Sequence, residues 1–403
     1  MRIGIDIRHL STRKHTGIEE YTYNLLPCLF RLGKNDQFIL LYNSYNRPVP
    51  HRVREWAINY PHVKIADYCW PSKVLNGLLL CFGFPKLDNL VFGVDVFFFP
   101  NIAFSAISSS VPTVLTFHDL SFEILPYLFN PYRRLWHFLV NPRKSAHRST
   151  ALITVSRSTA EDLKEIYQIP EEKINPIYLG VDKIFLKSNN AGHLSKPGIE
   201  EKIDLTMKLR YGLPEKPFIL YFGTLEPRKN ITGLIRAFEI FKSKTRSSHK
   251  LVIAGTIGWS YKEIFFRASR SKYKREIFFS GTIKDEDRPH LYKMADLFVF
   301  PSFLEGFGLP PLEAIASGVP VICSNSSSLL EIMGDTALMI NSYDIGELAW
   351  AIERGVSDSV LRKDLIAKGL VFAQFFTWKK TAEKTLAVLH RVAGLKKSNT
   401  VMR

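Results

Sequence analysis

The segment with the clearest chemical potential carries two carboxylates eight residues apart, Glu305 and Glu313. The apolar run at 297–300 before it is typical of a buried parallel strand, and Pro310 and Pro311 are typical of the first turn of a helix. Glycines between them let a ligand approach the backbone closely, and free N–H groups at a helix start bind phosphate. The amides expected beside such a phosphate are those of Gly306, Phe307, Gly308 and Leu309.

Carboxylates next to a phosphate site are expected to bind hydroxyl groups. A carboxylate repels phosphate, but it is a strong hydrogen-bond acceptor for the hydroxyls of a sugar or a ribose. Each glutamate also has a simpler explanation. The helix dipole favours Glu313 in a first turn, and Glu305 fits a solvated loop.

A second loop strengthens the case for a ligand. The apolar run at 218–223 is followed by Arg228 and Lys229, and then by a helical segment whose apolar side chains share one face. Open α/β sheets bind their ligands at the carboxyl ends of the strands. Two adjacent cations at such an end match the charge of a diphosphate.

These loops resemble those of retaining glycosyltransferases of family 4, which have the GT-B fold. The family signature Pro-Ser-x-x-Glu-Gly-Phe-Gly-Leu-Pro-x-x-Glu-Ala occurs here at 301–314. Similarity extends over nearly the whole chain, and residues 17–19 with 225–229 most resemble the mannosyltransferase branch. One departure is Glu20, where many relatives have Arg or Gly.

The resemblance implies an α/β architecture of two Rossmann-like, doubly wound parallel-sheet domains facing a cleft. It implies that the donor is a nucleotide sugar whose leaving diphosphate is stabilised by Arg228 and Lys229. In the family, the residue corresponding to Glu305 holds the donor sugar and the one corresponding to Glu313 holds the ribose. The base is expected near Ile283, through backbone and apolar contacts.

The resemblance also implies roles for residues of the first domain. Gly17 lets a loop approach the diphosphate or the acceptor, and His118 is placed to bond the sugar or the acceptor. Asp119 orients either the acceptor or the loop. Without the resemblance, a lone histidine at a strand end is more often structural.

The alternation of strands and helices predicts two doubly wound sheets. A stretch rich in Asn, Ser, Gly, Pro and Lys is typical of a linker. The predicted parts are a first domain at 1–186, a linker at 187–204, a donor domain at 205–376 and, from the resemblance, a helix at 377–394 that crosses back to the first domain. Strands are expected at 3–7, 38–42, 96–99, 113–117, 152–155, 174–179, 218–223, 251–254, 277–279, 297–300, 319–323 and 337–340.

The formal net charge of +16 over 403 residues needs an explanation. Nucleic acid is disfavoured as a partner, because the basic residues are dispersed and no nucleic-acid-binding motif is present. A membrane surface fits better, as a basic, aromatic-rich helix lying on anionic lipid. The alternative is a half-buried helix with solvated arginines. The residues concerned are Tyr127, Phe129, Tyr132, Trp136 and Phe138, with Arg133, Arg134, Arg143, Lys144 and Arg148.

Other features point to a cytoplasmic, metal-independent enzyme. No run of 18 apolar residues is present, the N-terminus is a predicted strand rather than a signal peptide, and the four cysteines have no metal-ligand spacing. The acidic turn at 285–287 is expected to cap a helix rather than to bind a metal. No cofactor is therefore expected.

The resulting functional hypothesis is a hexosyltransferase, with GDP-mannose as the preferred donor and a saccharide or lipid-linked acceptor. Its product would be a cell-envelope polysaccharide or glycolipid, and the enzyme would lie on the inner face of the cytoplasmic membrane. A UDP-sugar or ADP-sugar donor is the alternative within enzymes. The alternative in another class is a non-catalytic protein that binds a membrane surface or a nucleotide sugar.

Overall fold

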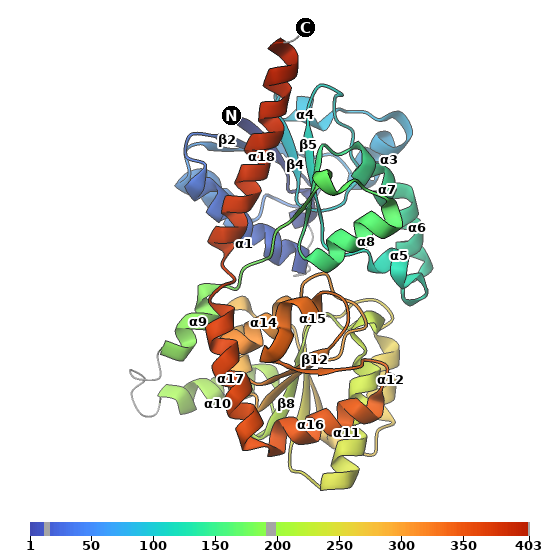
Figure 1. Ribbon diagram of the computed structural model, residues 1–403, viewed down its shortest axis with the longest axis vertical. Coiled ribbons are helices and arrows are strands. Elements are labelled where there is room, and N and C mark those ends of the chain that lie inside the picture. The colour runs from blue at the N-terminus through green and yellow to red at the C-terminus, as the bar shows by residue number, and fades with distance from the viewer. Residues whose placement is uncertain (12–16, 191–198, 402–403) are drawn as a thin grey trace. The chain divides into compact units, whose positions relative to one another are not determined.

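The computed structural model describes residues 1–11, 17–190 and 199–401, and it divides the chain into two compact units (Figure 1). Unit 1 consists of Met1–Pro126, Pro131–Gly180 and Trp378–Arg403, and unit 2 of Tyr127–Asn130 and Val181–Thr377. Part of the expected linker, residues 191–198, lies outside the described residues, as does Thr16 just before Gly17.

Unit 1 is built on a seven-stranded parallel sheet in the order β3-β2-β1-β4-β5-β6-β7. The strands are rich in aliphatic and aromatic residues on both faces, as expected where helices cover both sides of a parallel sheet. Their bounds are β1 Arg2–Asp6, β2 Gln37–Asn43, β3 Val63–Tyr68, β4 Val96–Phe99, β5 Thr113–Phe117, β6 Ala151–Thr154 and β7 Ile174–Pro176.

Helices cover both faces of this sheet (Figure 1). On one side lie α1 and α2, and on the other the series from α3 to α8. The bounds are α1 Gly17–Leu32, α2 His51–Asn59, α3 Ser72–Phe82, α4 Leu87–Leu90, α5 Ser121–Ile124, α6 Pro131–Val140, α7 Pro142–Arg148 and α8 Arg157–Tyr167. The final helix of the chain, α18 (Trp378–Val401), belongs to unit 1 and packs along α1.

Unit 2 repeats the design with a six-stranded parallel sheet in the order β10-β9-β8-β11-β12-β13. The order reverses between β8 and β11, and open α/β sheets bind their ligands at the carboxyl ends of the strands at such a reversal. The bounds are β8 Phe218–Phe222, β9 Lys250–Ala254, β10 Ile277–Gly281, β11 Leu297–Phe300, β12 Val321–Ser324 and β13 Leu338–Ile340.

The helices of unit 2 form two layers. In one layer α11 packs against α12 and α16, and in the other α14 packs against α13 and α17. The bounds are α9 Lys183–Asn190, α10 Ile199–Tyr211, α11 Ile231–Thr245, α12 Lys262–Ser269, α13 Arg288–Met294, α14 Leu309–Ala316, α15 Ser328–Met333, α16 Ile345–Ser357 and α17 Ser359–Ala373. The predicted α/β class with two doubly wound parallel sheets is confirmed.

Two expectations about the chain differ from the structure. Strand β3 was not expected, because the exposed Lys64 and Asp67 interrupt its apolar pattern at the edge of the sheet. The expected linker at 187–204 is helical where it is described, since it contains the end of α9 and the start of α10. The change from unit 1 to unit 2 comes earlier, between Gly180 and Val181.

The expected basic, aromatic helix is instead two short helices, α6 and α7. They are separated by Asn141, whose backbone is left-handed (φ 51°) and whose side chain accepts a hydrogen bond from the Lys144 amide. Two of the aromatic residues face inward: Phe129 is buried, and Trp136 packs against the core of unit 1.

Three glycines, Gly223, Gly255 and Gly281, lie at the carboxyl ends of β8, β9 and β10, where the backbone of unit 2 turns into the loops that follow. The Gly255 amide donates to Gly281 O at 2.8 Å, and the Gly223 amide donates to Ala254 O at 3.0 Å. Gly255 has φ +132°, and a Cβ there would lie 1.9 Å from the Gly223 carbonyl oxygen. Gly281 also has a positive φ, +67°, but a Cβ at this residue would meet nothing.

We predict that Gly255→Ala destabilises the protein more than Gly281→Ala. The Gly281 variant bears only the cost of a left-handed backbone, about 1–2 kcal/mol. The Gly255 variant adds an overpacking cost of about 1–3 kcal/mol against backbone that cannot move aside. Urea unfolding of both variants measures the difference, and equal losses of unfolding free energy would contradict the assigned close contact.

Candidate functional site

The predicted donor residues of unit 2 are brought together by two adjacent strands. Strands β8 and β11 pair directly, with Leu297 opposite Ile219, so the loops at their carboxyl ends meet. The Phe303 amide donates to Arg228 O at 2.9 Å, which ties one loop to the other.

The most closely coupled pair in this site is Lys229 with Glu305. The Lys229 ammonium donates to Glu305 Oε1 at 2.5 Å, and each residue is 8% exposed. Burial raises the pKa of Glu305, but the charges of Lys229 and Arg228 outweigh it, so the net pKa is lowered. The ammonium also lies over the Phe300 ring, 5.0 Å from its centroid. Glu305 is thus an ionised carboxylate within a buried ion pair rather than a solvated loop acid.

Arg228 is held by a second buried acid, Glu226, which the sequence analysis did not single out. The Nε and Nη2 groups donate to Glu226 Oε1 at 3.1 and 2.9 Å, and Nη1 donates to Leu304 O at 2.7 Å. Nη1 lies 3.5 Å from Glu305 Oε2. Burial raises the pKa of Glu226 despite the opposing charges of Arg228 and Lys229. The signal that was available is the spacing, an acid two residues before the arginine.

The backbone of Glu305 is braced from the next strand of the sheet. Its amide donates to Ser327 Oγ at 2.9 Å, and Ser328 Oγ donates to its carbonyl at 2.8 Å. Both serines lie where the chain enters α15 after β12. This bracing limits movement of the loop that carries the carboxylate.

The start of α14 has the geometry expected of an anion site. Gly308 precedes the helix with φ +97°, and a Cβ there would lie 2.5 Å from Leu329 Cδ2, so only glycine fits. Pro310 and Pro311 have no N–H, and the Leu312 amide donates to Gly308 O. An anion at this helix start therefore has to use the amides from Gly306 to Leu309.

Glu313 lies on α14, with each carboxylate oxygen engaged by α13. Tyr292 OH donates to Oε2 at 2.9 Å, and Arg288 Nη1 lies 3.3 Å from Oε1. Neither partner is expected from the sequence. Ile283 is buried in the loop after β10, two strands away from β8.

The acidic turn at 285–287 does not act as expected. Asp287 directly precedes α13, but its side chain makes no capping bond. Its Oδ2 accepts from Tyr211 OH at 2.5 Å and from Arg210 Nη1 at 2.7 Å instead. The predicted cap is wrong for Asp287, because these tertiary partners outcompete the local amides. Within the described residues, no group of three or more His, Cys, Asp or Glu side chains is arranged to hold a metal ion.

In unit 1, His118 and Asp119 follow the carboxyl end of β5. His118 Nε2 is 2.9 Å from Pro100 O, and a carbonyl only accepts, so Nε2 carries the proton. Burial lowers the pKa of His118, which leaves Nδ1 of the neutral ring as an acceptor. Asp119 Oδ1 accepts from the Ser121 amide at 2.9 Å and from Ser121 Oγ at 2.6 Å, which orients the turn into α5.

A second half-buried histidine, His9, follows β1 in the same unit and was not predicted. His9 Nε2 is 2.8 Å from Thr22 Oγ1, and burial lowers its pKa to about 4. Gly17 begins α1 and is exposed, and a Cβ there would meet nothing within 4 Å. Among the described residues, the packing of unit 1 therefore does not require glycine at this position.

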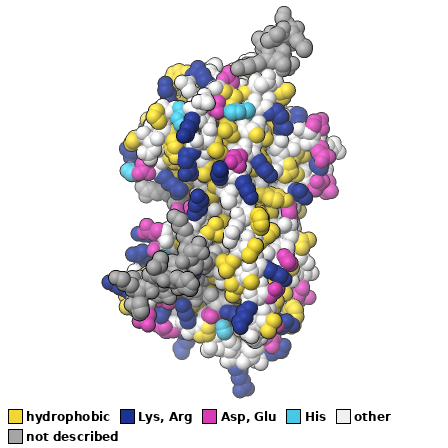
Figure 2. All heavy atoms as spheres, turned by 60° about the vertical axis from the view of Figure 1, so that its left-hand side comes forward, with side chains coloured by type: hydrophobic (Ala, Val, Ile, Leu, Met, Phe, Trp, Pro, Cys, Tyr) yellow, Lys and Arg dark blue, Asp and Glu magenta, His cyan; other side chains and the backbone are white. Residues whose placement is uncertain are grey.

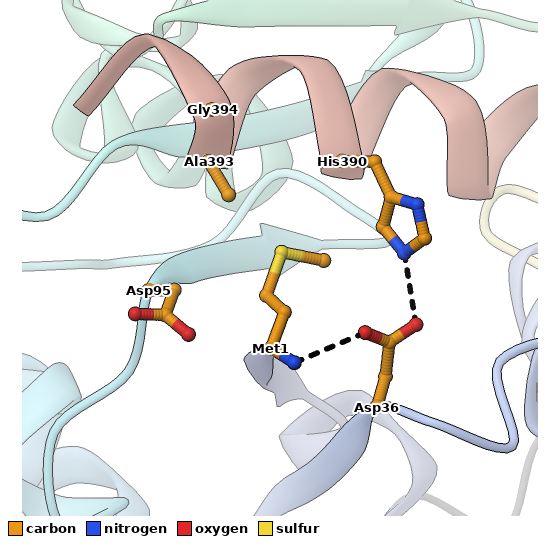
Figure 3. A pocket seen from close by; sticks show the side chains of 6 residues that line it. All are labelled: Met1, Asp36, Asp95, His390, Ala393 and Gly394. Atoms are coloured by element: carbon orange, nitrogen blue, oxygen red, sulfur yellow. Dashed lines mark hydrogen bonds and ion pairs between the residues drawn. The ribbon is translucent and has the colours of Figure 1, made fainter. Parts of the chain in front are cut away.

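A separate pocket of about 190 Å³ lies beside the amino ends of the unit 1 strands (Figure 3). Asp36 accepts from the Met1 amine at 3.2 Å and pairs with His390 on α18 at 2.8 Å. Asp36 and Asp95 directly precede β2 and β4. The pocket is therefore at the amino ends of the strands, where open α/β sheets do not bind their ligands, and it is smaller than a typical ligand pocket.

Comparison with known proteins identifies the family. Residues 15–183 match the model of Glycosyltransferase Family 4, and residues 208–370 match that of Glycosyl transferases group 1. The O-antigen chain mannosyltransferase B of Escherichia coli is 32% identical over 273 residues, which cover 68% of this chain and 68% of that protein. The chain is a family 4 glycosyltransferase.

A further relative and a solved structure are also similar to this glycosyltransferase. The serotype-specific mannosyltransferase WbdA of Escherichia coli is 31% identical over 275 residues, which cover 67% of this chain but 32% of WbdA. The glycosyltransferase thus spans about a third of WbdA. The crystal structure of WaaG, a glycosyltransferase involved in lipopolysaccharide biosynthesis, matches with a TM-score of 0.69 and 15% identity. That match covers 96% of this chain and 99% of WaaG, and it shows the GT-B fold.

We predict that Glu305→Gln destabilises the glycosyltransferase by about 3 kcal/mol at pH 7, because it leaves the buried Lys229 ammonium without its carboxylate. The lowered pKa of Glu305 means that its contribution is present above the unfolded-state pKa of about 4.3 and is lost as pH falls through the lower folded-state pKa. The difference in unfolding free energy between the two proteins should therefore shrink in acid.

Urea unfolding between pH 3 and pH 7 measures this difference. The matched control is Glu286→Gln, which removes an exposed carboxylate 3.7 Å from Lys284 and should have little effect. A Glu305 effect that is the same at pH 7 and pH 3 would refute the ionised pair.

Proposed function

We propose that the protein is a retaining mannosyltransferase that uses GDP-mannose and acts on a saccharide or lipid-linked acceptor in the synthesis of a cell-envelope polysaccharide. The observation that carries this proposal is the buried Lys229–Glu305 pair at the meeting point of two ligand loops. The Lys229 ammonium can bind a diphosphate, and the Glu305 carboxylate can accept hydrogen bonds from sugar hydroxyls. Both Escherichia coli relatives are mannosyltransferases, which supports mannose, and mannosyltransferase B acts on the O-antigen chain, which supports an O-antigen product.

The chemical step breaks the bond between the anomeric carbon and the diphosphate oxygen. The electron pair stays on that oxygen, and the acceptor hydroxyl oxygen forms its bond on the same face of an oxocarbenium-like sugar. The hydroxyl proton passes to the departing diphosphate. The charge that develops is stabilised by Lys229 and Arg228 and by the amides before α14, so no metal is required in this mechanism.

Glu305 exchanges its partner when the donor binds. In the structure its carboxylate neutralises Lys229, and a diphosphate at the same ammonium replaces part of that attraction. The carboxylate oxygens then accept from hydroxyls of the sugar. Arg228 stays bonded to Glu226 and Leu304 O and keeps the two loops in register.

In this proposal, residues of unit 1 contact the acceptor or the sugar. The neutral His118 offers Nδ1 as an acceptor for a hydroxyl group, and Gly17 leaves space for close approach. Asp119 holds the turn that follows His118. Ile283 provides an apolar contact for the base, and Glu313 accepts from the ribose.

We further propose that the enzyme binds the inner, anionic face of the cytoplasmic membrane through α6 and α7. Exposed apolar side chains occupy one side of α6, and the cations Arg134, Arg143 and Lys144 are exposed beside them. Figure 2 shows other Lys and Arg side chains scattered among acidic and apolar ones. No helix in the described part of the chain is both long and apolar enough to cross a bilayer. The apolar residues of α6 concerned are Tyr132, Leu135, Phe138 and Leu139.

We predict that GDP-mannose is consumed in the presence of a mannan-type acceptor and that the new linkage keeps the donor's anomeric configuration. Arg228→Ala should lower turnover by roughly 10²-fold or more, the scale of losing one electrostatic stabiliser. Product release and NMR of the new linkage measure both outcomes, and a thermal melt confirms that the variant is folded. Transfer from UDP-sugars or ADP-sugars alone would refute the donor, and no transfer from any sugar nucleotide would refute the activity.

We predict that changing Arg134, Arg143 and Lys144 to Gln weakens binding to anionic liposomes by about 1 kcal/mol per charge and makes the remaining binding less salt-sensitive. Liposome sedimentation at low and high salt measures this. Changing the exposed Lys262, Lys274 and Arg275 of unit 2 removes the same charge elsewhere and should have little effect. Equal losses for the two triple variants would show that net charge, not this surface, binds lipid.

A further inference from the structure

Two exposed tyrosines of unit 2, Tyr343 and Tyr127, lie next to each other. Tyr343 is 65% exposed and Tyr127 is 69% exposed. Partial burial raises the pKa of Tyr343, and a hydrogen bond between its side chain and that of Tyr127 raises it further. The two rings form one exposed aromatic surface, which we call the tyrosine platform. Neighbouring exposed apolar groups are typical of a surface that binds a ligand or a partner.

The turn that carries Tyr343 is held rigidly at the carboxyl end of β13. The Tyr343 amide donates to Asn341 Oδ1 at 3.0 Å, and Asp344 caps α16. The buried side chain of Asn230, which directly precedes α11, donates to Ser342 O at 2.7 Å. A tyrosine on such a pre-organised turn loses little conformational freedom when a ligand binds.

Tyr343 packs on Phe303, which belongs to the same loop as Glu305. The ring centroids of Tyr343 and Phe303 are 4.8 Å apart, and the ring planes are inclined by 31°. The Phe303 amide donates to Arg228 O at 2.9 Å, and its carbonyl accepts from Ser326 Oγ at 2.9 Å. Phe303 is two residues before Glu305, so the platform adjoins the loop of the carboxylate that is proposed to bind the donor sugar.

The segment that carries Tyr127, Tyr127–Asn130, is held in unit 2 by Trp259. Trp259 Nε1 donates to Leu128 O at 2.7 Å, and its ring stacks on Phe129 with centroids 5.2 Å apart. Trp259 lies in the loop after β9. Loops after β9, β11 and β13 thus support the platform, at the end of the sheet where open α/β folds bind their ligands.

The chemistry of the platform suits a sugar ring better than a lipid. One face of a pyranose presents C–H groups, which match the electron-rich face of an aromatic ring. Tyrosine hydroxyls at the rim of the platform can exchange hydrogen bonds with sugar hydroxyls. Asn341 and Asp344 are exposed on the same turn, and the negative charge of Asp344 opposes an anionic lipid surface.

We propose that the tyrosine platform binds a sugar unit of a mannan-type acceptor, next to the unit that receives the transferred sugar. This inference rests on the proposed function, in which the acceptor hydroxyl meets a donor sugar held by Glu305. An acceptor of several sugar units extends away from that point and meets the aromatic surface that adjoins the same loop. A single sugar cannot make both contacts at once, so the enzyme favours longer acceptors.

The test is a ligand-observed NMR titration of the full chain with linear mannotetraose and with methyl α-mannoside, both without donor. Mannotetraose should bind the unsubstituted protein about 3- to 10-fold more tightly, the scale of one added aromatic contact. Tyr343→Ala should remove most of this ratio. Tyr343→Trp should keep it, because the variant retains an exposed aromatic ring.

A matched control is Phe266→Ala, which removes a 62% exposed aromatic ring from α12 and should leave the ratio unchanged. Calorimetric titration with GDP should give the same affinity for Tyr343→Ala as for the unsubstituted protein, because the platform contacts the acceptor. A parallel loss of GDP affinity would contradict an acceptor surface.

The remaining outcomes separate this inference from the proposed function. The platform is overturned if the unsubstituted protein does not distinguish the two saccharides, or if Tyr343→Ala leaves the ratio unchanged. It is also overturned if Tyr343→Ala keeps the ratio and instead lowers sedimentation with anionic liposomes, since the surface then binds lipid. If Tyr343→Ala lowers the ratio but no sugar nucleotide supports transfer to mannotetraose, the saccharide site stands and the proposed function fails.

Discussion

The site depends on burying charges of both signs together. An isolated carboxylate or ammonium in a protein interior costs several kcal/mol, and a pair is tolerated only when each charge has a partner of good geometry. Here Glu226 and Glu305 are balanced by Arg228 and Lys229, and all four groups lie in two loops that meet. The group is close to neutral without a ligand. Under the proposed function, a diphosphate has to compete with Glu305 for the cations, and this competition would free the Glu305 carboxylate for the sugar.

The sheet explains why these charges meet where they do. The strand order reverses between β8 and β11. Because these two parallel strands are neighbours, the loops at their carboxyl ends lie side by side. Under the loops lies a layer of aromatic rings, in which Tyr221 and Phe298 stack on Phe300. These rings exclude water from the Lys229–Glu305 pair, so the electrostatic interactions there are stronger than on a surface.

Most of the architecture was predictable because parallel strands covered on both faces are continuous apolar runs. All the expected strands are present, within a few residues at each end. Edge strand β3 was missed because Lys64 and Asp67 interrupt its apolar run. The basic helix at 127–148 was expected to be continuous, yet Asn141 adopts a left-handed conformation that ends α6 and caps α7. Asp287 was expected to cap a helix, but Tyr211 and Arg210 provide stronger partners than the local amides.

The sequence by itself determined the residue types and the spacing of the site. The two glutamates eight apart, the Arg228-Lys229 dipeptide and the Gly308-Leu309-Pro310 helix start were all recognisable, as was the family. Only the tertiary structure decided the distant partners: Lys229 with Glu305, and Glu313 with Arg288 and Tyr292. The first of these pairs joins residues 76 positions apart. Spacing within one loop carries no information about such a contact, because strand order brings the loops together and burial then requires each charge to find a partner.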